Sequence, residues 1–97
     1  MDRDAAITLL KTHGAEPRRF GVQHLYLFGS TARGEARPDA DVDLFFDHEW
    51  RQLSLFDAME IQEVTARFLG CDTDAITRAS PHPVLRARIE NSAIPVF

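Results

Sequence analysis

Cysteine, lysine and long apolar runs are scarce in this sequence of 97 residues. The single cysteine, Cys71, excludes an internal disulfide bond, and the paired cysteines typical of zinc sites are absent. No apolar run approaches the length of a membrane-spanning helix, and "MDRDAAITLL" at the start contains no basic segment and no signal-like apolar segment. We therefore expect a protein of the reducing cytoplasm that has no contact with a membrane.

Basic residues are outnumbered by acidic residues. The sequence has 11 lysines and arginines against 15 aspartates and glutamates, which gives a formal net charge of −4. A general nucleic-acid-binding protein usually carries a basic stripe, so this class of protein is disfavoured. A composition of 44% hydrophobic and 27% charged residues is ordinary for a soluble globular fold. At this length we expect one domain over residues 1–97, with no room for a separate substrate domain.

The order of the predicted helices and strands indicates a small α/β (α+β) fold with helices mainly on one face of the sheet. Helical patterns cover residues 4–13, 16–20, 54–69 and 81–91. Strand patterns cover residues 22–29, 40–47 and 73–77, and a short extended tail covers 93–97. In the long helix the predicted apolar face consists of Leu55, Ala58, Met59, Ala66 and Leu69, flanked by Ile61 and Phe68.

Two carboxylates lie beside the second apolar strand. The two-residue period of a strand places Asp41 and Asp43 on one face and Val42 and Leu44 on the other. Two charges on a half-buried surface repel each other, so one takes up a proton unless a cation lies between them. Mg²⁺ prefers a few carboxylates together with water and substrate phosphates. The pair predicts a magnesium site, and the alternative is a solvated strand face.

A glycine-containing loop, "GSTARGE", directly follows the first apolar strand. Gly29 permits a tight turn and the close approach of a phosphate to backbone amides, and Ser30 can donate its hydroxyl to a phosphate oxygen. No Gly-Lys-Ser/Thr sequence follows, so the loop is not a P-loop. Arg33 either contacts phosphate or braces the loop against an acid. A phosphate-binding loop followed by paired carboxylates predicts a site for a nucleoside triphosphate and Mg²⁺.

The segment "GSTARGEARPDADVDL" resembles the signature of the DNA polymerase beta-like nucleotidyltransferase superfamily, G-S-x-x-R-G-x-x-x-x-x-S-D-x-D-L. The matching residues are Gly29, Ser30, Arg33, Gly34, Asp41, Asp43 and Leu44. Ala40 departs from the signature, because the family usually has serine there. Nearly the whole chain is similar to the minimal nucleotidyltransferases (MNT), which are the antitoxins of HEPN–MNT toxin–antitoxin pairs.

This resemblance implies transfer of AMP from ATP to a tyrosine hydroxyl on a HEPN toxin. It implies that Asp41 and Asp43 are catalytic and hold two Mg²⁺ ions together with a third carboxylate on a later strand. We favour Asp74 as this third residue because it lies inside an apolar stretch, and Asp72 remains the alternative on the same predicted face. The nucleotide would be bound by Gly29, Ser30, Arg33 and Gly34.

Two other functions remain open at this point. The chain could act as an antitoxin by binding its partner alone, or as a transferase that modifies a small molecule or an RNA end. The intact Gly-Ser and Asp-x-Asp motifs favour the enzyme over the purely steric inhibitor. The acidic net charge argues against the RNA-directed alternative. Both a homo-oligomer and a hetero-oligomer are compatible with the sequence.

Overall fold

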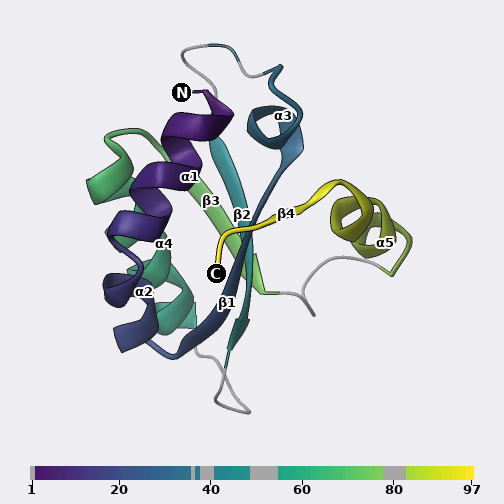
Figure 1. The fold of residues 1–97 in the computed structure, drawn as a ribbon. Helices are drawn as coiled ribbons and strands as arrows, with labels where there is room; N and C mark the ends of the chain where they lie inside the picture. Colours follow the sequence, from purple (N-terminus) through teal and green to yellow (C-terminus); the bar gives the residue numbers. More distant parts are fainter. Residues whose placement is uncertain (1, 36, 38–40, 49–54, 78–82) are drawn as a thin grey trace.

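A four-stranded mixed sheet organises the chain in the computed structural model, which describes residues 2–35, 37, 41–48, 55–77 and 83–97 (Figure 1). The strand order is β3-β2-β1-β4. Strand β1 (Val22–Phe28) pairs antiparallel with β2 (Val42–His48) and with the short β4 (Ile94–Pro95). Strand β3 (Thr73–Thr77) pairs parallel with β2 at one edge of the sheet. The strands predicted from the sequence pattern are therefore all present.

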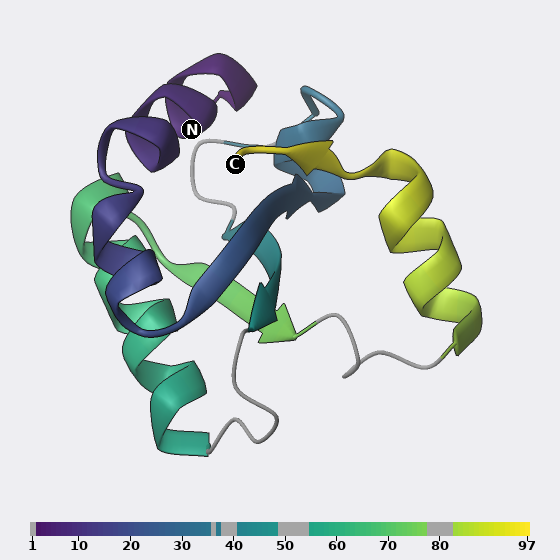
Figure 2. The same cartoon turned by 60° about the horizontal axis from the view of Figure 1, so that its bottom comes forward.

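Helices cover one face of this sheet much more completely than the other. Helices α1 (Arg3–Thr12), α2 (Ala15–Arg19) and α4 (Leu55–Leu69) lie together on the first face, whereas α5 (Pro83–Ser92) lies on the opposite side (Figure 2). Helix α3 (Gly29–Ala32) is a single turn directly after β1. The predicted α/β fold with helices mainly on one face is confirmed. Among the described residues, no helix is long and apolar enough to cross a membrane.

The hydrophobic core fills the space between the sheet and the first helical layer. Alternate strand residues point into it, including Leu25 and Leu27 of β1 and Val42, Leu44 and Phe46 of β2. These five side chains are fully buried. Burying a large apolar side chain stabilises a fold by about 1.5–3 kcal/mol. The intervening residues of β1 and β2 therefore lie on the second face, which carries the polar site.

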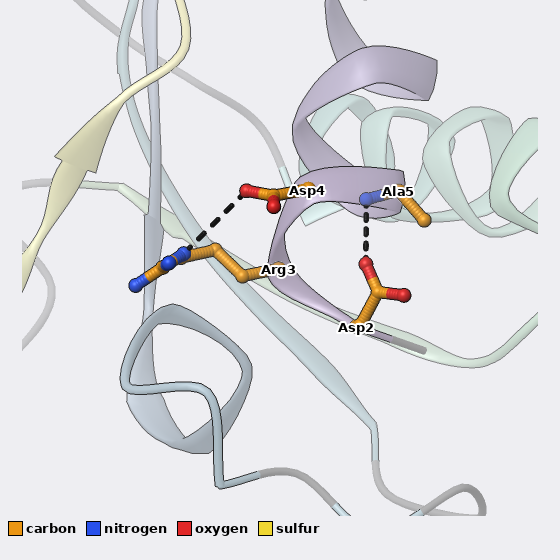
Figure 3. Close-up of polar contacts among 4 residues, drawn as sticks. All are labelled: Asp2, Arg3, Asp4 and Ala5. Atoms are coloured by element: carbon orange, nitrogen blue, oxygen red, sulfur yellow. Dashed lines mark hydrogen bonds and ion pairs between the residues drawn. The ribbon is translucent and has the colours of Figure 1, made fainter.

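The first helix begins at an aspartate cap. The Asp2 carboxylate Oδ1 accepts a hydrogen bond of 2.8 Å from the backbone N–H of Ala5 (Figure 3). This bond satisfies one of the four amides that a helix N-terminus leaves without an intrahelical partner. Arg3 and Asp4 form an exposed ion pair of 3.7 Å beside it. The cap fixes the start of α1, whose Ala6 and Leu10 are buried in the hydrophobic core.

The buried face of α4 differs from the predicted face. Ile61, Val64, Thr65 and Leu69 are buried, whereas Met59 is 50% exposed, so the prediction is wrong for Met59. The burial follows three- and four-residue steps from Ile61, and Met59 falls off this line. Gly70 has φ +74° and ends the helix as predicted, with its N–H donating to the Ala66 carbonyl. The Leu55 side chain lies outside the described residues.

A small polar network joins α4 to the edge strand β3. The hydroxyls of Thr65 and Thr73 lie 3.0 Å apart, and the Thr73 hydroxyl also donates to the Gln62 carbonyl. The Gln62 side-chain oxygen accepts a 3.2 Å hydrogen bond from the backbone N–H of Ala75. This side chain satisfies an outward-facing amide of an edge strand, a group that would otherwise be open to another strand. The network holds β3 in place, and β3 carries Asp74.

Candidate active site

Asp43 and Asp74 are direct neighbours on the second face of the sheet. Asp43 of β2 pairs in register with Asp74 of β3 on one side and with Phe28 of β1 on the other. The next residue along each strand, Leu44 or Ala75, is buried in the core. Because side chains alternate along a strand, both carboxylates point away from the core. The structure therefore brings together two of the three predicted carboxylates.

The two candidates for the third carboxylate occupy different places. Asp74 lies within β3 and lines a hollow together with Asp43. Asp72 is exposed and precedes the first residue of β3, and its carbonyl accepts a 3.0 Å hydrogen bond from the Val42 N–H. The apolar stretch around Asp74 favours it over Asp72 in the sequence. The strand register also places Asp74 directly beside Asp43.

The loop glycine Gly29 packs directly against Asp43. Gly29 has φ +74°, which is a left-handed conformation that favours glycine. A Cβ atom at this position would overlap the carboxylate oxygen Oδ2 of Asp43 and would lie 3.2 Å from its Cγ. The glycine therefore makes room for the carboxylate itself, in addition to any role in admitting a phosphate.

The electrostatics of the site favour a cation beside Asp43. Burial is the largest cause that raises the pKa of Asp43 above its ordinary value near 3.8, followed by the charges of Asp74 and Asp41. The Arg33 guanidinium lowers the same pKa by a smaller amount. Two neighbouring carboxylates without a sufficient positive partner resist full ionisation. Asp41 is exposed directly before the first residue of β2, close enough for its charge to act on Asp43.

The donor set suits Mg²⁺ that is shared with a substrate. Among the residues that the structure describes, no group of three or more histidine, cysteine or acidic side chains is placed so that it could hold a metal ion by itself. Mg²⁺ commonly takes only one or two carboxylates and completes its coordination with water and substrate phosphates. The in-register pair Asp43 and Asp74 fits this kind of site, with Asp41 at its margin.

Arg33 braces the loop and also faces the site. Its Nε lies 3.1 Å from the Glu35 carboxylate, and both side chains are more than half exposed. Exposed ion pairs of this kind contribute about 0–1 kcal/mol, so the pair is weak. Both alternatives from the sequence therefore remain available to Arg33. Helix α3 begins at Gly29, so Ser30 lies in its first turn, and Ala40 lies outside the described residues.

A hollow of about 390 Å³ lies over Asp43, Asp74 and the loop that begins at Gly29. Its lining consists of Phe28, Gly29, Arg33, Asp43, Asp74, Ile76, Ile89 and Ser92. It thus joins the loop after β1, the two carboxylates and one side of α5. A volume near the lower end of the range for small-molecule sites suits a small ligand or part of a larger one.

The sequence pattern of the nucleotidyltransferase domain family matches residues 15–96. The chain belongs to this family. The nucleotidyltransferase is also 39% identical over 74 residues to the protein adenylyltransferase MntA of Thermococcus cleftensis, covering 75% of this chain and 74% of that protein. A relative from Methanocaldococcus jannaschii, provisionally described as a protein adenylyltransferase, is 33% identical, covering 81% of this chain and 84% of the relative.

Solved structures show the same fold. A structure described as a minimal nucleotidyltransferase matches with a TM-score of 0.84 and 30% identity, covering 98% of this chain and 96% of that chain. A more distant match, with a TM-score of 0.69 and 20% identity, is a chain from the complex of the tri-AMPylated Shewanella oneidensis HEPN toxin with MNT antitoxin. It covers 94% of this chain and 71% of that chain. The chain is thus a nucleotidyltransferase enzyme of the minimal, polymerase-beta-like type.

Some residues of the site were not predicted from the sequence. Ile89 and Ser92 of α5 line the hollow, although they lie some fifty residues from the signature, so only the fold brings them there. The Arg33–Glu35 pair had a local signal, because opposite charges two residues apart flank Gly34. Gly34 itself has φ +72°, and a Cβ there would meet nothing within 4 Å, so its contribution is the turn.

Proposed function

We propose that this nucleotidyltransferase transfers AMP from ATP to a tyrosine hydroxyl of a HEPN toxin and thereby acts as its antitoxin. The observation that carries the proposal is the in-register pair of Asp43 and Asp74 beside the Gly29 loop. The description of the 39% identical relative as a protein adenylyltransferase supports the reaction class. A neighbour of the same fold, 22% identical with a TM-score of 0.71, is a toxin–antitoxin structure with AMP-PNP, which suits a nucleotide substrate.

In this proposal the carboxylates hold the ions and move the proton. Asp43 and Asp74, with Asp41 at their margin, would hold the two Mg²⁺ ions. Bound Mg²⁺ neutralises phosphate charge and lowers the pKa of a hydroxyl that it contacts. Gly29 and Ser30 bind the β- and γ-phosphates, and Gly34 keeps the loop turned toward them. Arg33 exchanges its weak pairing with Glu35 for a phosphate oxygen.

The transfer step balances as a substitution at the α-phosphorus. The acceptor oxygen forms a bond to the α-phosphorus, and the bond from that phosphorus to the oxygen bridging the β-phosphate breaks. Pyrophosphate leaves, and Asp74 takes the proton of the acceptor hydroxyl. Asp74 is exposed, so it can pass this proton on to water. The product is a phosphodiester between AMP and the toxin.

The test is the intact mass of a candidate HEPN partner, taken from the adjacent gene, after incubation with this chain, ATP and Mg²⁺. We expect a gain of one or more AMP units, and we expect the Asp41→Asn/Asp43→Asn double variant to produce none. A stable complex that gains no AMP would instead assign the chain to the steric antitoxins. AMP found on an RNA end or a small molecule alone would assign it to the third class of function.

A further inference from the structure

The hollow has an apolar side next to its carboxylates. The strand register builds two adjacent rows across the second face of the sheet. One row consists of Phe28, Asp43 and Asp74, and the next consists of Tyr26, Phe45 and Ile76. Residues two apart on a strand are separated by about 6 to 7 Å. The apolar row therefore lies one such step from the carboxylates.

Aromatic packing fixes this apolar side in place. Tyr26 and Phe45 stack with ring centroids 4.6 Å apart, and Phe28 meets Phe45 at 5.8 Å in a tilted arrangement. Phe45 is only 2% exposed, so it forms the base on which its neighbours rest. Phe28 and Ile76 remain partly exposed above this base and line the hollow. An apolar surface held in this way is organised before any ligand arrives.

Helix α5 supplies a further apolar side chain, Ile89, together with Ser92. It lies on the same side of the sheet as the carboxylates, away from the main helical layer (Figure 2). Its residue Ile89 is 9% exposed and lines the hollow together with Phe28 and Ile76. Three apolar side chains from three separate elements thus surround the space beside Asp43 and Asp74.

We propose that Phe28, Ile76 and Ile89 form the seat for the ring of a phenolic acceptor, so that its hydroxyl reaches the carboxylates. This inference rests on the proposed function and names the side chains that select the acceptor. A tyrosine has an apolar ring between its backbone and its hydroxyl, so the ring covers the apolar row with a gain from burial. A serine hydroxyl is one carbon from the backbone, so a serine acceptor would place polar backbone groups over that row at a cost.

The nucleobase is the rival occupant of the seat. A polar ribose separates the base of ATP from its α-phosphate. With the α-phosphate at Asp43, a base seated on Phe28, Ile76 and Ile89 would bring the ribose over the same apolar side chains. The apolar character of Phe28, Ile76 and Ile89 favours the acceptor ring over this sugar.

The experiment measures AMP transfer from ATP, with Mg²⁺, to N-acetyl-tyrosinamide, to N-acetyl-serinamide and to the HEPN protein. The variants are Ile76→Ala and Ile89→Ala, with Met59→Ala as the matched control because Met59 is an exposed apolar residue on α4. We expect the tyrosine compound to be preferred over the serine compound. We expect each seat variant to raise the KM of the tyrosine acceptor about tenfold, with the KM of ATP unchanged. Thermal melting of each variant checks that the fold is retained. Ile89→Ala changes a residue of α5, outside the sheet.

Several outcomes decide against the seat. A rise in the KM of ATP with an unchanged acceptor KM would assign the seat to the nucleotide. Preference for the serine compound, or AMP on a serine or threonine of the HEPN protein, would overturn the seat while transfer to a hydroxyl stands. If only the HEPN protein is modified, on a tyrosine, the seat is supported when Ile76→Ala and Ile89→Ala slow this transfer and Met59→Ala does not. Equal rates in all three variants would overturn the seat. Absence of AMP on every acceptor would overturn the proposed function and the seat together.

Discussion

The carboxylate of Asp43 fills the space that a side chain on residue 29 would need. A Cβ atom at Gly29 would overlap Oδ2 of Asp43 and would lie 3.3 Å from the Asp43 Cβ. The first glycine of the signature is thereby coupled to the second aspartate of the same signature, although fourteen positions separate them in the chain. A change in the loop at Gly29 is therefore expected to displace the Asp43 carboxylate.

Gly29→Ala is expected to lower stability and to abolish transfer. A left-handed conformation costs an alanine about 1–2 kcal/mol, and the new methyl group must also displace the Asp43 carboxylate. Gly70→Ala is the matched control, because Gly70 has the same φ of +74° and a Cβ there meets nothing within 4 Å. Urea denaturation gives the stability of both variants, and intact mass of the HEPN protein gives transfer. Equal losses of transfer in the two variants would contradict the coupling.

Asp43→Asn is expected to stabilise the metal-free protein at neutral pH. Burial and the neighbouring carboxylates raise the pKa of Asp43 in the fold, so its ionised form is less favourable there than in the unfolded chain. The cost of the native carboxylate is absent below the unfolded pKa, grows as pH rises toward the folded pKa, and is fully present above it. Melting temperatures from pH 3 to pH 8 in chelator should therefore separate with rising pH. A variant that is less stable than the native chain at pH 8 would count against this account.

Mg²⁺ should reverse that order of stability. An ion that binds the folded state stabilises it, and the native chain has the carboxylate that the variant lacks. We expect the melting temperature of the native chain to rise with added Mg²⁺ and that of Asp43→Asn to stay nearly constant. Equal responses of the two proteins would place the ion elsewhere.

The third carboxylate is expected to be Asp74. Asp74→Asn should lower the rate of transfer by a factor on the order of 10² or more, because it removes a ligand and the acceptor of the proton. Asp72→Asn removes the same charge at an exposed position outside the pair with Asp43, so the rate should stay within about a factor of three. Single-turnover rates at saturating ATP make the comparison. The reverse ranking would assign the role to Asp72.

Thr65→Val is expected to destabilise the fold by about 1–2 kcal/mol. The Thr65 hydroxyl is fully buried and lies 3.0 Å from both the Ile61 carbonyl and the Thr73 hydroxyl. Thr12→Val is the matched control, because the Thr12 hydroxyl makes a similar bond of 2.7 Å to the Thr8 carbonyl at an exposed position. Chemical denaturation measures both. A cost for Thr65→Val no larger than that of Thr12→Val would show that burial of the network adds nothing.

Most of the architecture could be predicted because the apolar periods are strong. The pattern "TDAIT" coincides with the bounds of β3, and the alternation around Val42 and Leu44 placed the core face of β2 correctly. The face of α4 was misjudged at Met59, because Leu, Met and Ala are plentiful around that helix and the sequence does not say which line meets the sheet. That choice depends on packing against distant residues.

The site was predictable only as far as local spacing reaches. The signature pointed to Asp41 and Asp43, but strand alternation treated Asp72 and Asp74 alike. The choice between them depends on the register of β3 against β2, which is a pairing of residues about thirty positions apart. The contact of Gly29 with Asp43 and the wall formed by Ile89 are also long-range, so a linear pattern does not contain them.

The hydrogen bond from the Ala75 amide to Gln62 protects the chemistry as well as the strand. Side chains alternate between the faces of a sheet, so sliding β3 by a single residue would turn Asp74 toward the core and bring Thr73 or Ala75 to the position beside Asp43. Such a slipped chain would keep its strands and lose its carboxylate pair. Inserting or deleting one residue between Gly70 and Thr73 is therefore expected to damage this enzyme more than most substitutions there. Gln62 on α4 helps to fix the register of β3, because it binds the Ala75 amide.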